Sequence, residues 1–313
     1  MKTVVLGTSG AMVSQMGLGA MFMGTRTERA LSLELLDRYV AAGGSFIDTA
    51  NIYAAWVSGF RGGESEELLG DWMRQRRNRS QLFLATKVGF GYPGAERGLT
   101  AAQIEAECEK SLKRLGVDAI DLYYAHVDDR TTPQEESLGA FQRLVRAGKV
   151  RFAGASNFLA WRLAEAEALV DRQGWGGYCC IQQRHTYLRP HPGASFDPQI
   201  AANDDLLDYC RTRGVTLLAY SPLLGGAYSR SDRPIPEQYR GPDSDARVSR
   251  LASVARELGA TANQIVLAWM LRSNPAVIPV MAASTVEQLT ENLGALEIGL
   301  TAERIAYLDG GSS

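Results

Sequence analysis

Short apolar runs alternate with longer stretches of helical periodicity along the chain after Met16. Such runs are typical of strands buried on both faces, and their alternation with helical stretches favours a parallel sheet covered by helices. The runs that predict strands are 17–21, 45–48, 82–87, 120–126, 151–156, 178–183, 215–221 and 276–280.

Helical stripes occupy the stretches between these runs, and glycine ends several of them. Three stripes are Leu31, Leu35, Tyr39 and Val40 before Gly43-Gly44; Ile104, Cys108, Leu112 and Leu115 before Gly116; and Leu138, Phe141, Leu144 and Val145 before Gly148. The third predicted helix starts at Thr132-Pro133-Gln134-Glu135, with a threonine N-cap, proline at the first helical position and a capping-box partner. Further helices are predicted at 161–173, 204–213, 262–273 and 286–298.

Eight β/α units in 313 residues predict an α/β fold, a (β/α)8 TIM barrel forming one domain over residues 1–313. A doubly wound sheet would instead carry GxGxxG after its first strand, and neither Gly7-Thr8-Ser9-Gly10 nor Gly17-Leu18-Gly19 has that spacing. We expect the segment before Met16 to form a β-hairpin at the barrel bottom. The stretch 229–247, rich in proline and charge, follows the seventh predicted strand and predicts a lid loop on the active face.

The composition narrows the classes of function. Hydrophobic residues make up 45% of the chain, and the net charge of -2 gives no basic signal for nucleic acid or an anionic membrane. No apolar run is long enough for a signal peptide or a membrane span. The four cysteines have neither a disulfide framework nor CxxC metal spacing, which predicts a reduced, cytoplasmic protein.

Four polar residues stand at or just after the ends of predicted strands. Asp48 ends the second strand, Lys87 the third and His126 the fourth, and Tyr53 follows Asp48 by five residues. A barrel presents its reacting groups at these strand ends, and neighbouring parallel strands lie about 4.8 Å apart. We therefore expect the four side chains to converge on one spot.

Together the four groups suit the reduction of a carbonyl. Hydride addition leaves negative charge on oxygen, and a free tyrosine, with a pKa of about 10, donates its proton slowly at neutral pH. We expect the Lys87 ammonium to lower the pKa of Tyr53, Asp48 to hold the lysine, and His126 to orient the substrate oxygen. Singly, each residue is more often a cap, a packing residue, a solvated charge or a structural histidine, so the combination carries the prediction.

Longer strings resemble the aldo-keto reductase superfamily. FIDTANIY, ATK and YYAH match that family's tetrad of Asp, Tyr, Lys and His in strand order, and GESEELLG, GASNF, AYSPLLGG and TVEQLTENLGA extend the likeness over nearly the whole chain. The chain looks closest to the branch that includes sugar-type bacterial reductases and potassium-channel β subunits. The resemblance implies a (β/α)8 barrel, a nicotinamide cofactor and a small-molecule carbonyl substrate.

The resemblance also implies a set of cofactor contacts. Ser156, Asn157 and Gln182 would hold the nicotinamide carboxamide, and Tyr220 would stack on its ring. The remaining nicotinamide and pyrophosphate contacts would come from Ala20, Met21, Asp48, Ser221, Pro222, Leu223 and Gly225. Adenosine contacts are expected from Ser284, Gln288, Glu291 and Asn292, although Thr285 and Gln288 also suit a capping box.

NADPH is the expected cofactor, with NADH as the alternative. The string MAASTVEQ lacks the arginine or lysine with which the family often binds the 2′-phosphate, and Ser284 with Gln288 stands in its place. An arginine from the stretch 229–247 would then supply the charge; the candidates are Arg230, Arg233, Arg240 and Arg247.

The leading interpretation is an NAD(P)H-dependent carbonyl reductase that runs reversibly, with Tyr53 as the acid. Candidate substrate contacts are Met23, Trp56, Phe90 and His185, the last at a position where relatives commonly carry tyrosine. The alternative is a cofactor-binding, redox-sensing or regulatory subunit with slow turnover. A metal-dependent hydrolase is disfavoured, because the chain has only three histidines and no HxH pair; its ligands would be chosen from His126, Asp128, Asp129, His185 and His191.

Overall fold

Eight parallel strands close into a barrel, which confirms the predicted (β/α)8 fold. The computed structural model describes residues 1–310. In order around the barrel the strands are β3 (Gly17–Gly19), β4 (Phe46–Asp48), β5 (Phe83–Val88), β6 (Ile120–Ala125), β7 (Val150–Ser156), β8 (Tyr178–Arg184), β9 (Thr216–Tyr220) and β10 (Val277–Met281). Pairing of β10 with β3 closes the ring, so the order of the strands follows the chain.

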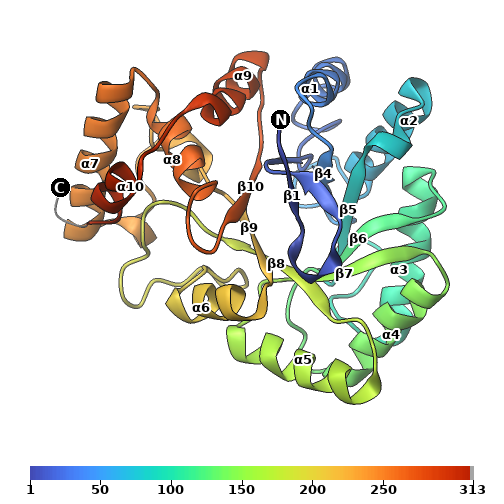
Figure 1. The fold of residues 1–313 in the computed structure, drawn as a ribbon. Coiled ribbons are helices and arrows are strands. Elements are labelled where there is room, and N and C mark those ends of the chain that lie inside the picture. Colours follow the sequence, from blue (N-terminus) through green and yellow to red (C-terminus); the bar gives the residue numbers. More distant parts are fainter. Residues whose placement is uncertain (311–313) are drawn as a thin grey trace.

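Helices surround the barrel and follow one another around the ring, so that the first helix meets a late one (Figure 1). They are α1 (Arg29–Ala41), α2 (Glu64–Arg76), α3 (Ala101–Leu115), α4 (Gln134–Arg146), α5 (Ala160–Gln173), α6 (Asp204–Arg213), α7 (Pro242–Leu258), α8 (Ala262–Met270), α9 (Val286–Gly294) and α10 (Ala302–Asp309). Helices α2, α7 and α10 are absent from the sequence prediction. The apolar stripe Leu68, Leu69, Trp72 and Met73 is the signal that identifies α2.

A two-stranded hairpin lies at the bottom of the barrel, as predicted. Strands β1 (Thr3–Val5) and β2 (Met12–Ser14) pair antiparallel ahead of the barrel. Between them, the Gly7 amide donates a 2.6 Å hydrogen bond to Thr216 Oγ1 at the start of β9. A Cβ at Gly7 would lie 1.8 Å from the carbonyl oxygen of Cys179, and the φ of +48° also disfavours a side chain. Gly7 therefore allows the hairpin to sit directly on the strand ends.

Side chains fill the inside of the barrel. Leu6 and Val13 of the hairpin region are fully buried there. They join a cluster of inward-facing strand residues: Phe46, Phe83, Ala85, Leu122, Tyr124, Cys179, Cys180, Leu218, Ile278 and Val280. A larger cluster packs the outer faces of the strands against the helices. The filled barrel is thus a rigid platform for the groups at the carboxyl ends of its strands.

The start of α4 differs from the prediction. Pro133, and not Thr132, occupies the N-cap position, and no side chain caps the helix there. The Thr132 hydroxyl instead donates a 2.7 Å hydrogen bond to Asp129 Oδ2. A hydrogen bond from a hydroxyl to a charged carboxylate is stronger than one between a neutral helix amide and a hydroxyl, so the Thr132 side chain turns toward Asp129. The end of the helix at the left-handed Gly148 agrees with the prediction.

The stretch 229–247 is a loop only in part, which corrects the expected bounds of the lid. Its last six residues form the first turns of α7, which begins with Pro242 directly after Gly241. Proline is well suited to this first helical position, so its presence there marks a helix start rather than a loop. Tyr239 is buried, with its ring centroid 5.4 Å from that of Phe196. The exposed side chains are concentrated in residues 229–234.

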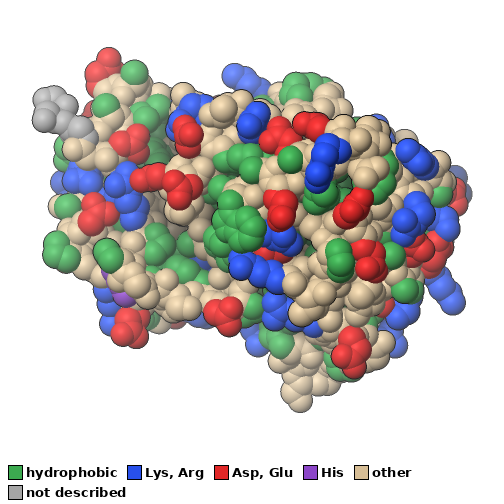
Figure 2. All heavy atoms as spheres, turned by 90° about the horizontal axis from the view of Figure 1, so that it is seen from below, with side chains coloured by type: hydrophobic (Ala, Val, Ile, Leu, Met, Phe, Trp, Pro, Cys, Tyr) green, Lys and Arg blue, Asp and Glu red, His purple; other side chains and the backbone are tan. Residues whose placement is uncertain are grey.

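The surface carries both signs of charge. Figure 2 shows acidic and basic side chains interspersed across one face of the molecule, without a field of a single sign on that face. Within residues 1–310, none of the helices combines the length and apolar character that crossing a bilayer requires.

Candidate active site

The four polar residues meet at the carboxyl ends of neighbouring barrel strands. Asp48 is the last residue of β4, Lys87 lies one residue before the end of β5, and His126 directly follows β6. Tyr53 comes from the turns after β4. The side chains of Asp48, Lys87 and His126 are buried, whereas Tyr53 is partly exposed. Tyr53 is therefore the member of the group that solvent or a substrate can reach most readily.

Lys87 connects the group. Its ammonium donates hydrogen bonds to Asp48 Oδ1, to the carbonyl oxygen of Thr49 at 2.8 Å and to the Tyr53 hydroxyl at 2.6 Å. These contacts use all three protons of the ammonium. The Tyr53 hydroxyl also lies 3.3 Å from Asp48 Oδ1. A hydrogen-bonded chain thus runs from the mouth of the site into the barrel.

Burial dominates the protonation of this chain. Burial, followed by the negative charge of Asp48, raises the pKa of Tyr53 well above its ordinary value of 10.0. Burial lowers the pKa of Lys87, and the charge and hydrogen bond of Asp48 oppose that shift. The direction at Tyr53 is opposite to the lowering expected from Lys87, because burial, followed by the charge and hydrogen bond of Asp48, raises the pKa of the phenol. Tyr53 consequently keeps its proton at neutral pH, as a proton donor must.

His126 is neutral and faces the Tyr53 ring. Burial, followed by the nearby charge of Lys87, lowers the pKa of His126 well below 6.5. The His126 and Tyr53 ring centroids lie 6.1 Å apart, and His126 Nδ1 is buried without a hydrogen-bond partner among residues 1–310. A neutral imidazole has one N–H donor, so His126 can donate a hydrogen bond to an oxygen without carrying charge.

Gln182 reaches Asp48 from across the barrel. Its Nε2 donates a 2.8 Å hydrogen bond to Asp48 Oδ2, while Lys87 binds Oδ1. Both carboxylate oxygens therefore have a donor, which fixes the plane of the carboxylate. The two residues are 134 positions apart, so no local pattern in the sequence announces this contact.

Asn157 is fully engaged by the protein. Its Nδ2 donates to the carbonyl oxygen of His126 at 2.9 Å and to Ser156 Oγ at 3.0 Å. Its Oδ1 accepts from the Ile200 amide at 3.1 Å and from the Tyr220 hydroxyl at 2.7 Å. An amide has two donor hydrogens and two acceptor lone pairs. A contact between Asn157 and a nicotinamide carboxamide therefore requires the exchange of one of these bonds.

The chain that follows β9 turns through several left-handed residues. Ser221, Leu224 and Gly225 have φ values of +54°, +49° and +67°. Leu224, Gly225 and Gly226 are left-handed in succession, and the Leu224 and Gly226 amides already donate to the carbonyl oxygens of Ser221 at 3.2 Å and Leu223 at 2.8 Å. Ser221 and Leu223 are partly exposed, whereas Pro222 is buried. A pyrophosphate contact by this turn stays a prediction.

The first barrel strand has fewer free backbone groups for a cofactor than expected. Both backbone groups of Ala20 are occupied: its amide donates to the carbonyl oxygen of Asp48 at 2.8 Å, and its carbonyl oxygen accepts from Ser65 Oγ at 2.7 Å. Met21 follows with a partly exposed side chain. Of this pair, Met21 is the residue that can approach a ligand.

The start of α9 brings the expected adenosine contacts together. Thr285 Oγ1 accepts from the Gln288 amide at 3.2 Å, but the Gln288 side chain accepts from the Ser284 amide at 2.7 Å rather than from Thr285. The capping box is therefore only half formed. Glu291 and Asn292 lie one turn further along the helix, and Asn292 Nδ2 donates to a carbonyl oxygen of the preceding loop at 3.2 Å.

Four arginines were expected as candidates to bind a 2′-phosphate, and the structure excludes Arg247 from them. Its side chain is 2% exposed and donates to a backbone carbonyl oxygen at 3.3 Å and to Asp243 at 3.1 Å. Because α7 starts before it, Arg247 ties this helix to the loop after β8 instead of facing solvent. Arg230, Arg233 and Arg240 are exposed.

Trp56 and Phe90 flank the mouth of the site. Trp56 is 53% exposed, and its ring stands edge-on to Tyr53 with centroids 6.4 Å apart. The Phe90 ring is edge-on to His126 at 4.8 Å. Large aromatic side chains therefore stand beside Tyr53 and His126, and a substrate contact by either stays a prediction.

Met23 and His185 lie behind the mouth. Met23 is buried in the core between strands and helices. His185 stacks on Trp269 at a centroid distance of 5.9 Å, and burial lowers the pKa of His185 to about 4. Burial favours a structural role for Met23, whereas His185 is partly exposed beside Trp269 and its substrate contact stays a prediction.

A hollow of about 470 Å³ opens on the same side as the tetrad. It lies between loops that follow β5, β6, β7 and β8, and the sequence prediction did not identify it. Its lining is Arg97, Val127, Asp128, Asp129, Arg130, Thr131, Asn157, Asp197, Pro198 and Ile200. The sequence feature that could have identified this hollow is the position of its loops directly after strand ends, where barrel enzymes place their substrate contacts.

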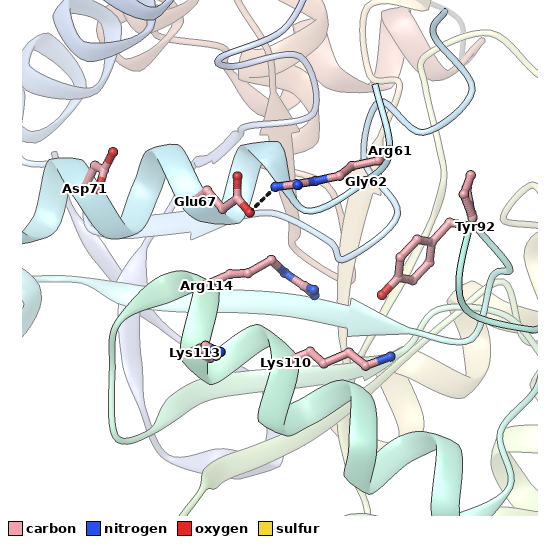
Figure 3. A pocket seen from close by; sticks show the side chains of 9 residues that line it. Arg61, Gly62, Glu67, Asp71, Tyr92, Lys110, Lys113 and Arg114 are labelled. Atoms are coloured by element: carbon pink, nitrogen blue, oxygen red, sulfur yellow. Dashed lines mark hydrogen bonds and ion pairs between the residues drawn. The ribbon is translucent and has the colours of Figure 1, made fainter. Parts of the chain in front are cut away.

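A larger hollow, of about 630 Å³, lies away from the tetrad beside α2 and α3 (Figure 3). It contains several cations, but most already have a partner: Arg61 with Glu67 at 2.5 Å, Lys110 with Glu107 at 2.7 Å and Arg114 with Glu66 at 2.6 Å. Cations that are already paired with carboxylates have little charge left for a ligand. The smaller hollow is therefore the better candidate for a substrate pocket. Within residues 1–310, no three His, Cys, Asp or Glu side chains are grouped so that they could hold a metal ion.

Comparison with known proteins places this geometry in context. Residues 15–312 match the model of the "Aldo/keto reductase family". The uncharacterized oxidoreductase YrpG of Bacillus subtilis is 32% identical over 328 residues, covering 99% of this chain and 95% of the relative. The norsolorinic acid reductase stcV of Emericella nidulans is 33% identical over 321 residues, covering 96% and 79%.

A solved structure is similar over the whole chain. The crystal structure of a thermostable aldo-keto reductase, Tm1743, in complex with the inhibitor epalrestat has a TM-score of 0.78 and 32% identity, and the match covers 99% of each chain.

Proposed function

The chain belongs to the aldo/keto reductase family, and on that premise we propose that it is an NADPH-dependent enzyme that reversibly reduces an aldehyde or ketone to an alcohol. Members of this family are oxidoreductases that reduce carbonyl groups with nicotinamide cofactors. The observation that carries the assignment of roles is the 2.6 Å contact between the Tyr53 hydroxyl and Lys87 Nζ at the mouth of the site.

The roles follow from the contacts. Bound nicotinamide would supply the hydride to the carbonyl carbon. As negative charge develops on the substrate oxygen, Tyr53 donates the proton of its hydroxyl, and the adjacent Lys87 ammonium stabilises the phenolate that remains. Asp48 keeps Lys87 charged in spite of its burial. His126, which is neutral, donates a hydrogen bond that orients the substrate oxygen.

The residues fit such a cofactor at both of its ends. The Tyr220 ring is partly exposed beside the left-handed turns after β9, and the start of α9 presents uncharged groups at Ser284 and Gln288. Tyr220 would stack on the nicotinamide ring once its hydroxyl gives up the hydrogen bond to Asn157. Gln182 would accept a hydrogen bond from the carboxamide through its Oε1, while its Nε2 keeps the hydrogen bond to Asp48. The exposed loop 229–241 would cover the pyrophosphate as a lid.

A direct assay tests the function. NADPH oxidation is followed by absorbance against a panel of aldehydes, ketones and sugars, with a chelator present in a parallel series. We expect turnover with at least one carbonyl and no effect of the chelator. Tight NADPH binding without turnover on any carbonyl would contradict the proposal and favour a regulatory, cofactor-sensing subunit.

Carbonyl reduction will keep its rate as the pH rises through neutrality. Burial and Asp48 hold the pKa of Tyr53 above 10.0, and a group with a raised pKa loses its proton only above that raised value. We therefore expect kcat for reduction to stay level from about pH 6 to about pH 9, while alcohol oxidation, which needs the phenolate, rises over that range. Single-turnover rates at each pH give the measurement. A tenfold fall in reduction below about pH 8 would contradict the assignment.

NADPH will bind about tenfold more tightly than NADH, because one charged hydrogen bond to the 2′-phosphate contributes about 1.5 kcal/mol. The charge must come from the loop, since α9 opens without a cation. Fluorescence titrations of Arg230→Gln, Arg233→Gln and Arg240→Gln with both cofactors identify the residue. One variant should lose affinity for NADPH and keep its affinity for NADH; an unchanged ratio in all three would refute the loop as the source.

We also propose a cytoplasmic location and a small-molecule substrate as the only partner of the site. All four cysteines are free and buried, which supports a reducing compartment.

A further inference from the structure

We propose that Tyr124 is a positioning residue whose ring stabilises the Lys87 ammonium from inside the barrel. The inference rests on the proposed function, in which the charge of Lys87 stabilises the Tyr53 phenolate. Lys87 Nζ lies 4.6 Å from the centroid of the Tyr53 ring and 5.6 Å from that of the Tyr124 ring. An ammonium within about 6 Å of an aromatic face is attracted by it, and the attraction is strongest where water is excluded. The lysine thus lies between two phenol rings.

The strand register places Tyr124 beside the lysine. Lys87 on β5 and Tyr124 on β6 are directly paired, so both side chains point to the same face of the sheet. Tyr124 belongs to the fully buried cluster that fills the barrel, directly below the layer of the tetrad. Its ring is therefore a fixed part of the surroundings of Lys87 and not a mobile surface group.

Gly154 on β7 makes room for this ring. It is the register partner of Tyr124 on the other side. A Cβ at position 154 would lie 2.8 Å from the Tyr124 ring and 3.0 Å from Cys180 Sγ. The ring can lie in the barrel interior because the neighbouring strand carries no side chain at this level.

The hydroxyl of Tyr124 does not explain the residue. Tyr124 Oη is buried without a hydrogen bond of ordinary geometry among residues 1–310, and Gln182 and the Cys180 thiol are the polar groups that act on it. A buried hydroxyl without a partner costs free energy, so packing alone would favour phenylalanine. The ring face toward Lys87 is the interaction that Tyr124→Phe would keep and an aliphatic side chain would lose.

The charged and titratable groups around the pair are few. Those that act on Lys87 or Tyr124 are Asp48 on β4, Tyr53 after β4, Glu66 on α2, His126 after β6, and Cys179 and Cys180 on β8. Glu66 is already bonded to Arg114 and Thr86, and His126 is neutral. Asp48 is the anion in direct contact with the ammonium, and the Tyr124 ring adds to the stabilisation given by Asp48, the Thr49 carbonyl oxygen and Tyr53.

Three variants separate the ring from the hydroxyl. Tyr124→Leu and Tyr124→Met remove the aromatic face and keep an apolar side chain, and Tyr124→Phe keeps the face. Loss of a cation–π contact of about 0.5 to 2 kcal/mol lowers the lysine pKa by about half a unit to one and a half units. Because Lys87 must be charged to stabilise the Tyr53 phenolate, kcat for reduction should begin to fall at a pH that is lower by the same amount in the Leu and Met variants, and Tyr124→Phe should restore the wild-type profile.

A direct titration of Lys87 keeps this test independent of turnover. The chain has only five lysines (Lys2, Lys87, Lys110, Lys113 and Lys149), so carbon-13 labelling of the lysine ε-carbon gives few NMR signals. Lys87→Met assigns the signal of Lys87, and Lys110 serves as the internal reference.

The outcomes are distinct. A lower Lys87 pKa in Tyr124→Leu or Tyr124→Met, with Tyr124→Phe at the wild-type value, supports the inference. Equal values in all variants, or an equal shift in Tyr124→Phe, overturns it. If the wild-type protein reduces no carbonyl, the proposed function fails while the titration still decides whether Tyr124 acts on Lys87.

Discussion

The Tyr53→Phe variant will lose about 100- to 10,000-fold in kcat for carbonyl reduction, while its Kd for NADPH stays near the wild-type value. The substitution removes one oxygen, the atom that lies 2.6 Å from Lys87 Nζ and that we assign as proton donor. The ring and its edge-on contacts with Trp56 and His126 remain. The loss is therefore chemical, and it should appear in single-turnover rates as well as in the steady state.

Tyr92→Phe is the matched control for this variant. Tyr92 also follows a barrel strand, and its hydroxyl also donates to a carboxylate, that of Glu107, at 2.7 Å. It lines the hollow beside α2 and α3 and does not contact the tetrad. We expect Tyr92→Phe to keep kcat within about threefold of the wild type. A loss below tenfold in Tyr53→Phe would rule out Tyr53 as the acid.

The Gly7→Ala variant will lower the free energy of unfolding by about 3 kcal/mol or more. A Cβ at this position would lie 1.8 Å from the carbonyl oxygen of Cys179, so either the hairpin or β8 must move. The left-handed φ of +48° adds strain of about 1 kcal/mol for any residue with a side chain. Displacement of the hairpin would also weaken the burial of Leu6 and Val13 at the barrel bottom. Urea unfolding followed by tryptophan fluorescence measures the loss.

Gly10→Ala separates the two causes, because Gly10 lies in the same connection with a φ of +70° but has open space where a Cβ would stand. It should lose only the conformational contribution, about 1 kcal/mol. If Gly7→Ala and Gly10→Ala lost the same amount, close contact with Cys179 would not be what fixes the hairpin. Both variants should keep the kinetics of the folded enzyme, because the hairpin lies at the end of the barrel opposite to the tetrad.

The strands were predictable because each is buried on both faces and short. All eight observed strands lie within two residues of the predicted bounds, and their closure in chain order follows from the alternation of strand and helix. The positions of Asp48, Lys87 and His126 followed for the same reason, since a strand end can be read from the sequence. Tyr53 could be named only through its distance from Asp48 and the resemblance.

The remaining features depend on contacts between distant residues. The bond from Gln182 to Asp48 crosses the barrel, and the four hydrogen bonds of Asn157 join three loops. The lid prediction was wrong at its C-terminal end, because a proline such as Pro242 suits both a loop and the first residue of a helix. Assignment of Pro242 to a loop placed Arg247 on the lid, whereas Arg247 is buried in α7. The raised pKa of Tyr53 is a further example, because burial outweighs the charge of a neighbour that the sequence does reveal.

Closure of the barrel by β10 against β3 has a consequence for synthesis of the chain on the ribosome. Strand β10 spans Val277–Met281, so β3 and β9 each keep an unpaired edge until nearly nine-tenths of the chain has been made. Exposed edges of this kind can pair with other chains, and a nascent protein with two of them needs protection until its last strand emerges. Premature termination before residue 277 should therefore yield aggregation-prone chains instead of a partly active barrel.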